Sequence, residues 1–155
     1  MKPSSRNDLP DFMTLYERYH KSISNGARAE LRRIAQPDQL VEAPSFYRLT
    51  VGFGSDERIQ RLVFCLPYIR HIANGKKLGH ALAEAKVSEK RLFMVIRSQP
   101  PNDLIQLRRL LQQAEPAVDW QDAAKQLYYW NDLSKRTLLE DYFLHLNEST
   151  KSVTA

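Results

Sequence analysis

Apolar residues recur every three or four positions along most of the chain, which is the spacing that buries one face of an α-helix. In residues 104–114 such a stripe runs from Leu104 to Ala114, and it leaves Arg109 opposite the stripe and Arg108 at its edge. The pattern therefore predicts that this arginine pair points outward. Stripes of this kind predict eight helices, within residues 11–26, 27–36, 57–75, 78–86, 88–99, 102–114, 120–132 and 135–147.

Turn-forming and capping residues set the expected limits of these helices. Residues 62–66 are apolar on all sides, which indicates a central buried helix that Pro67 should kink or split. Residues 37–56 contain prolines and glycines and predict a loop with short helical turns, or a brief strand at 46–51, and Gly75 is expected to begin a turn. The expected N-caps are Asp56, Ser88, Asn102, Asp119 and Ser134.

Together these features predict an all-α fold, a compact bundle of about eight helices. We expect one domain over residues 10–148, with a possible subdivision near residues 98–102 at the sequence QPPN. Residues 1–9 and 149–155 are polar and are expected to be flexible tails. Circular dichroism dominated by strand would contradict this fold class.

The composition narrows the class of protein further. No apolar run is long enough to span a bilayer, the first ten residues lack the apolar core of a signal peptide, and Cys65 is the one cysteine. These features favour a cytoplasmic protein without disulfides or membrane contact.

The sequence offers no recognisable catalytic or metal-binding motif. The four histidines, His20, His71, His80 and His145, have no ligand spacing, and a single cysteine excludes a zinc cluster built on thiolates. No phosphate-binding glycine loop or nucleophile elbow occurs, and Cys65 lies between Phe64 and Leu66 as an inert buried thiol would. We therefore expect no enzymatic activity, no cofactor and no metal.

Charge is the remaining signal. The chain carries a net charge of +5, and residues 1–98 hold 17 Lys and Arg against 10 Asp and Glu, a balance of +7, whereas residues 99–155 have a balance of −2. Arginine forks bind phosphate oxygens, so several cations on outward helix faces favour a nucleic-acid backbone as partner, although solvated faces and internal ion pairs explain any single dipeptide. The candidate nucleic-acid-binding residues are Arg28, Arg32, Arg33, Arg48, Lys76, Lys77, Lys90, Arg91, Arg97, Arg108, Arg109, Lys135 and Arg136.

Several segments taken together resemble the CasB family. They include ELRRIAQPDQLVEAPSFYRL (residues 30–49), SEKRLFMVIRS (88–98) and LIQLRRLLQQAEPAVDW (104–120), and the likeness extends over roughly residues 12–147. That family is the small helical subunit of the type I-E CRISPR surveillance complex, Cascade. The resemblance implies a non-catalytic subunit, present in two copies, that contacts other Cascade subunits, the guide RNA and target region, and the displaced DNA strand of the R-loop. Cleavage would belong to a separate nuclease-helicase.

Two other classes of function remain open on the residues alone. Residues 76–98 have the length of a helix-turn-helix, as in a DNA-binding regulator, but residues 92–96 are apolar where a recognition helix needs polar side chains. A purely structural interaction protein could instead pair its arginines with acidic partners. Salt dependence of nucleic-acid binding by the isolated protein separates these two classes from each other.

Overall fold

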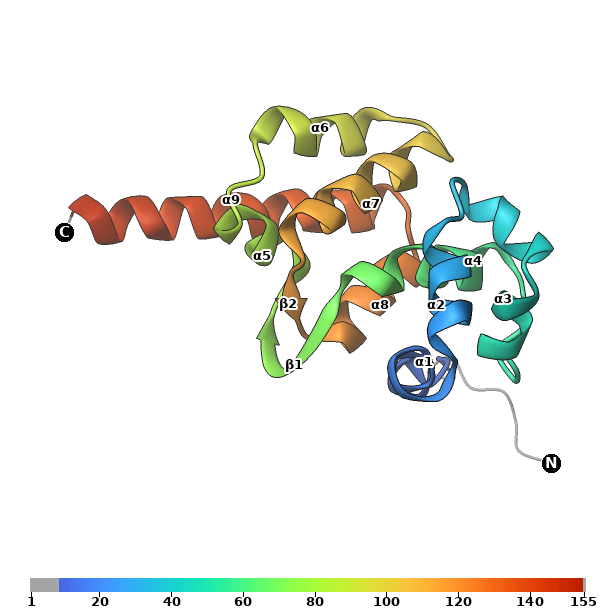
Figure 1. Cartoon of the computed structure of the whole chain (residues 1–155). Coiled ribbons are helices and arrows are strands. Elements are labelled where there is room, and N and C mark those ends of the chain that lie inside the picture. Colours follow the sequence, from blue (N-terminus) through green and yellow to red (C-terminus); the bar gives the residue numbers. More distant parts are fainter. Residues whose placement is uncertain (1–8, 155) are drawn as a thin grey trace.

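The computed structural model describes the backbone of residues 9–154 and the side chains of residues 9–146. The all-α prediction is confirmed, because the described part contains nine α-helices, three short helical segments and one sheet of two short strands (Figure 1). In chain order the elements are α1 (Phe12–Glu17), η1 (Arg18–Ser22), α2 (Asn25–Arg32), η2 (Pro37–Glu42), α3 (Pro44–Leu49), α4 (Glu57–Cys65), η3 (Leu66–Tyr68), β1 (Arg70–Lys76), α5 (Leu78–Glu84), α6 (Glu89–Arg97), α7 (Asn102–Ala114), β2 (Ala117–Val118), α8 (Trp120–Tyr128) and α9 (Asp132–Thr154).

Helix α4 is the central element and is shorter than the sequence predicts. Its residues Leu62, Val63, Phe64 and Cys65 are buried, as the apolar run indicates. The sequence predicts a kinked helix that continues to residue 75, but the helix ends at Cys65 because Pro67 has no N–H to donate to the preceding turn. The chain instead makes the 3-10 turn η3 and then becomes strand β1.

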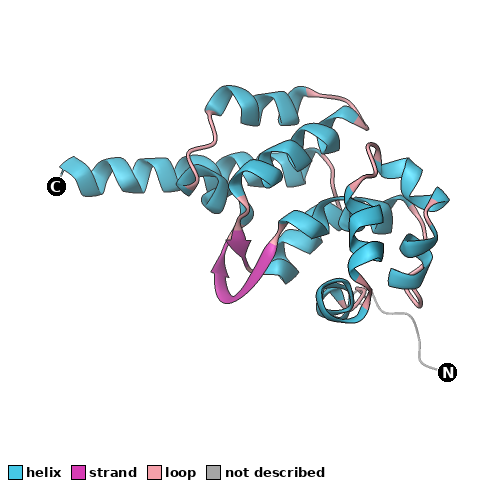
Figure 2. Ribbon diagram, viewed as in Figure 1, coloured by secondary structure: helices cyan, strands magenta, loops and turns pink. Residues whose placement is uncertain are grey.

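Strand β1 curves back on itself beside the two-residue strand β2 (Figure 2). The Arg70 N–H donates to the carbonyl of Pro116 at 2.9 Å, and the Asp119 N–H donates to the carbonyl of Lys76 at 3.1 Å. Gly75 therefore lies within β1, whereas the sequence predicts that it begins a turn. A Cβ at Gly75 would lie 2.5 Å from the backbone carbon of Val118, so this close approach of two backbones requires glycine.

Three of the five predicted helix caps are confirmed. The side chains of Asp56, Ser88 and Asp119 accept hydrogen bonds from the first turns of α4, α6 and α8. Ser134 is not the cap of the last helix. Asn131 occupies that role, since its side-chain oxygen accepts from the Ser134 N–H at 2.9 Å and the helix begins at Asp132.

Two further segments differ from expectation. Asn102 is the first residue of α7 and Pro101 precedes it as the N-cap, without a side-chain hydrogen bond. Residues 46–51, a possible strand, form the end of helix α3 and the turn after it, because Pro44 fits the first turn of a helix.

A single cluster of buried apolar residues includes side chains from all nine α-helices. The domain limits and the subdivision near residues 98–102 stay predictions. Of the expected flexible tails, residues 1–8 and 155 and the side chains beyond residue 146 lie outside the described part, while the backbone of α9 continues to Thr154. None of the helices in the described part has both the length and the apolar character needed to cross a bilayer.

Helix α5 packs most extensively on α9, and Gly79 allows the two backbones to meet. A Cβ on Gly79 would collide with the carbonyl oxygen of Leu138 and lie 2.8 Å from the Cβ of Asp141 and 2.9 Å from the backbone nitrogen of Tyr142. These neighbours are rigid backbone and Cβ atoms, so they cannot rotate away. The packing of α5 on α9 therefore depends on the absence of a side chain at residue 79.

We predict that Gly79→Ala lowers the free energy of unfolding by about 2 kcal/mol, because the added methyl must push α5 away from α9. Gly26→Ala is the matched control, since a Cβ there meets only the Ser24 hydroxyl at 3.8 Å. The control should leave stability within about 0.5 kcal/mol of the wild type, or raise it slightly. Urea denaturation followed by circular dichroism measures both, and equal behaviour of the two variants would contradict the packing.

Candidate nucleic-acid interface

The thirteen predicted cations differ in what their charged groups contact. Four predicted cations, Arg28, Arg91, Arg108 and Lys135, are half-buried and contact other parts of the chain, and the Arg91 guanidinium donates to the side-chain oxygen of Gln113. Two, Lys76 and Lys77, pair with carboxylates on neighbouring helices. The other seven side chains are exposed, namely Arg32, Arg33, Arg48, Lys90, Arg97, Arg109 and Arg136.

Arg28 donates hydrogen bonds to backbone carbonyls at the C-terminal end of η1. Its Nη1 donates to the carbonyls of Tyr19 at 3.1 Å and Ile23 at 2.9 Å, and its Nη2 donates to the Asn25 side chain. These carbonyls belong to the last turn of η1 and the residue after it, where no helical N–H follows to pair with them. Arg28 therefore satisfies a helix end, and its guanidinium is already occupied.

Lys135 is the most enclosed of the predicted cations. Its ammonium lies 2.9 Å from Oδ2 of Asp103, and the two side chains are only 12% and 1% exposed. The indole N–H of Trp130 donates to the same carboxylate oxygen at 3.0 Å. This ion pair joins α7 to α9 inside the protein, and removing either partner would leave a buried charge uncompensated.

Arg108 does not point outward, contrary to the helical-phase prediction. Its guanidinium carbon lies 3.9 Å from the ring centre of Phe64 on α4 and 6.0 Å from that of Tyr68 on η3. Burial lowers the pKa of the guanidinium, which stays charged at neutral pH, and Nη1 is buried without a hydrogen bond to any described residue. A rotation of about 100° per residue places Arg108 at the edge of the apolar stripe of α7. Tyr68 of η3 covers this edge, so the side chain is not free to point into solvent. Arg109 is exposed as predicted.

Lys76 and Lys77 begin the segment that leads into α5. The Lys76 ammonium pairs with both carboxylate oxygens of Glu84, and the Lys77 ammonium lies 3.8 Å from a carboxylate oxygen of Asp122. Both pairs are exposed, so a polyanion could compete for these ammonium groups at a small energetic cost.

Arg33, Arg48, Lys90, Arg97, Arg109 and Arg136 make neither a hydrogen bond nor an ion pair through their side chains within residues 9–146. Arg33 and Arg48 both lie close enough to Glu30 to lower the pKa of its carboxyl group, although hydrogen bonds from Ser45 contribute more. The two arginines, on the ends of α2 and α3, thus belong to one local cluster.

Segment η3 contacts both α2 and α7. Arg32 of α2 donates to the Tyr19 hydroxyl at 3.3 Å, and Tyr68 of η3 lies beside Arg108, which precedes Arg109. We call the exposed arginines Arg32, Arg33, Arg48 and Arg109 the α2–α7 basic surface. These cations come from segments that are far apart in the sequence.

Helix α6 carries a second group of predicted cations. Lys90 and Arg97 line a shallow surface hollow together with Phe93 and Met94, and the Arg97 guanidinium carbon lies 4.7 Å from the Phe93 ring centre. Met94 is 47% exposed. A cation beside an open apolar surface can contact both a phosphate and a base, so this hollow differs in chemistry from the α2–α7 basic surface.

Comparison with known proteins identifies the family of this chain. The sequence profile of the family described as CRISPR-associated protein Cse2 matches residues 27–143. The chain belongs to the Cse2 family. It is 38% identical to the CRISPR system Cascade subunit CasB of Escherichia coli strain K12, over 92% of this chain and 98% of that protein. A chain of the crystal structure of E. coli Cascade bound to a PAM-containing double-stranded DNA target is 40% identical and superposes with a TM-score of 0.85, covering 91% of this chain and 99% of that one.

This Cse2 protein also uses arginines that the sequence pattern does not single out. Arg61 donates to the carbonyls of Leu127 and Tyr128 at 2.8 and 2.6 Å, and Arg18 donates to those of Leu49 and Val51 at 2.9 and 2.7 Å. Both arginines thus satisfy carbonyl groups at the C-terminal ends of helices, α8 for Arg61 and α3 for Arg18. Because each partner lies more than 30 residues away, helical periodicity carries no signal for them.

We predict that Arg108→Ala lowers the free energy of unfolding by about 1 kcal/mol or more, because the variant lacks the stack on Phe64 and the packing of the arginine stem. Arg109→Ala should change stability by no more than about 0.5 kcal/mol, since its side chain is exposed. Arg108→Met keeps the apolar stem and should retain most of the stability. Chemical denaturation of the three variants measures these changes. Equal destabilisation by Arg108→Ala and Arg109→Ala would contradict the packing of Arg108 on Phe64.

Cys65 should be unreactive in the folded protein. Its side chain is fully buried, and burial raises the pKa of the thiol to about 12. Because the thiolate is the reactive form, an aromatic disulfide reagent at mildly alkaline pH should label one thiol per chain only after denaturation. Rapid labelling of the native protein would show that α4 opens in solution.

Proposed function

We propose that this protein is the non-catalytic small subunit of a Cascade-type, RNA-guided DNA surveillance complex in the cytoplasm. Its role is to bind nucleic-acid backbone and to stabilise the R-loop formed by guide RNA, target strand and displaced strand. Membership of the Cse2 family and the likeness to the CasB subunit support the assembly. The observation that carries the binding role is the set of exposed arginines Arg32, Arg33, Arg48 and Arg109, none of which forms an ion pair within residues 9–146.

The chemistry of the α2–α7 basic surface suits backbone binding better than base reading. Arginine presents a planar fork of N–H groups that matches two phosphate oxygens, and each phosphate that is neutralised releases counterions. Such contacts fix the position of a strand without reading its sequence. Sequence specificity in this account comes from base pairing with the guide.

The exposed side chains that line this surface bind rather than react. Arginine stays protonated at physiological pH, so it can neither accept a proton nor attack a substrate. The thiol of Cys65 is buried and protonated, and no strand can reach it. We infer that cleavage belongs to a separate protein, and that other Cascade subunits and a second copy of this chain are its protein partners.

The arrangement of residues 76–98 disfavours the alternative of a helix-turn-helix regulator. Helix α5 packs chiefly on α9, and α6 packs chiefly on α7. In a helix-turn-helix the two helices pack together so that the second enters the major groove. The outward side of α6, with Met94 exposed between Lys90 and Arg97, also offers few groups for hydrogen bonding to base edges.

The test is a salt titration of single-stranded DNA binding by the full chain, followed by fluorescence anisotropy on two unrelated oligonucleotides. We expect Arg33→Gln combined with Arg109→Gln to weaken binding on both oligonucleotides. The slope of log affinity against log salt should become shallower by about 0.7 for each phosphate that the variant no longer neutralises. A change equivalent to two phosphates would be visible well above the error of the fit.

The matched control is Lys86→Asn combined with Lys125→Gln, which removes the same charge from exposed positions outside the predicted set. Asparagine suits residue 86 because its φ is 65°. The control should leave the slope near the wild-type value. Equally weakened binding by both double variants would mean that only net charge matters, and unchanged binding by Arg33→Gln/Arg109→Gln would favour a purely structural role for these arginines.

A further inference from the structure

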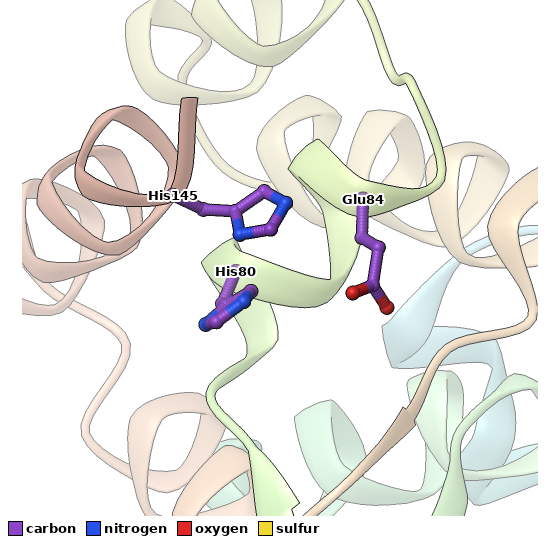
Figure 3. A group of neighbouring side chains, drawn as sticks. All are labelled: His80, Glu84 and His145. Carbon is purple, nitrogen blue, oxygen red and sulfur yellow. The ribbon is translucent and has the colours of Figure 1, made fainter. Parts of the chain in front are cut away.

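Two imidazoles and a carboxylate converge where α5 packs on α9 (Figure 3). His80 and Glu84 lie one turn apart on α5, and His145 faces them from α9. Their ligand atoms, one from each side chain, all lie within 4.8 Å of one another. We propose that His80, Glu84 and His145 form a binding site for a divalent transition-metal ion, with zinc as its preferred occupant among the commonly available ions.

Helix geometry explains why these three residues meet. Residues four apart lie on the same side of a helix, so His80 and Glu84 point together from α5. Gly79 lets the backbone of α5 lie directly against α9, which brings His145 into reach of both. The two imidazole rings are already stacked, with their centres 4.1 Å apart and their planes inclined by 33°. The spacing is not apparent in the sequence because the third ligand lies 61 residues after Glu84.

The donor set selects the class of ion. Two imidazole nitrogens and one carboxylate oxygen are the protein ligands of many zinc sites, in which water fills the fourth position. Calcium and magnesium prefer sites made of oxygen atoms, so they fit poorly here. In a tetrahedral zinc site, ligand atoms about 2.1 Å from the metal lie about 3.4 Å apart, so the three side chains need only modest rotations to close around the ion.

Lys76 is the group that a metal ion must displace. Its ammonium pairs with both oxygens of Glu84, and the two side chains are 43% and 50% exposed. An ion pair this exposed contributes little to stability, so zinc can replace the ammonium at small cost. Exposure of Glu84 also leaves a path for the ion and for a bound water.

A half-buried carboxylate on α9 is a further polar group near these residues. Asp141 lies one turn before His145, and its Oδ2 is buried without a hydrogen bond to any described residue. Burial raises the pKa of this carboxyl group, while Lys77 and, more weakly, His80 oppose that effect, so His80 lies within electrostatic reach. Metal-bound imidazoles commonly donate their second N–H to a carboxylate, which would orient the ring.

The experiment is zinc titration by isothermal calorimetry on the tag-free full chain after removal of metals with a chelator. We expect one zinc ion per chain, and we expect cobalt to give the visible absorption bands of a tetrahedral site. His80→Ala and His145→Ala should each weaken zinc binding on the order of tenfold or more. Glu84→Gln, an exposed change that leaves the core intact, should weaken it as well.

Two further variants distinguish a site from general metal affinity. Lys76→Met removes the competing ammonium and should tighten zinc binding, whereas the control His20→Gln, on η1, should bind zinc as the wild type does. Zinc should also raise the melting temperature of the wild type but not of His145→Ala, because the ion links α5 to α9. No binding by the wild type, or unchanged binding by His80→Ala and His145→Ala, would overturn the proposal.

Discussion

The early end of helix α4 is the constraint on which the rest of the structure depends. Pro67 has no N–H, so the chain leaves the central helix after Cys65 and turns through η3 into strand β1. This turn places Tyr68 beside Arg108, and it lets Nδ1 of His71 accept the Trp120 N–H at 3.1 Å at the start of α8. It also delivers Lys76 to the start of α5. One missing hydrogen-bond donor thus sets the neighbours of α7, α8 and α5.

Burial divides the basic side chains into two groups with different physical roles. Arg18, Arg28 and Arg61 donate to carbonyl oxygens near helix ends, and Lys135 neutralises the buried Asp103. These cations replace their hydration with bonds inside the protein, as a buried charge requires. The exposed arginines of the α2–α7 basic surface keep their hydration and remain available to phosphates. Net charge alone does not distinguish the two groups.

Local sequence patterns are sufficient for most of the helices but not for the packing between them. The stripes of α2, α6, α7 and α8 and the caps at Asp56, Ser88 and Asp119 follow from residues within one or two turns. The strand pair β1–β2, the burial of Arg108 and the meeting of His80 with His145 depend on partners 40 to 65 residues away. Periodicity carries no information at such separations. A prediction from helical phase is therefore correct for the exposed Arg109 and wrong for Arg108, which packs on Phe64.

The division of cations is tested most directly by comparing Arg28→Gln with Arg109→Gln, two changes that remove the same charge. For each variant, unfolding in urea and affinity for single-stranded DNA at low salt are measured on the same preparation. The account predicts that Arg28→Gln is less stable than the wild type and keeps its affinity when folded, because the Arg28 guanidinium is bonded to backbone carbonyls. Arg109→Gln should keep its stability and bind DNA more weakly. If both variants bind equally weakly and neither is destabilised, burial does not separate structural from binding cations, and the account is contradicted.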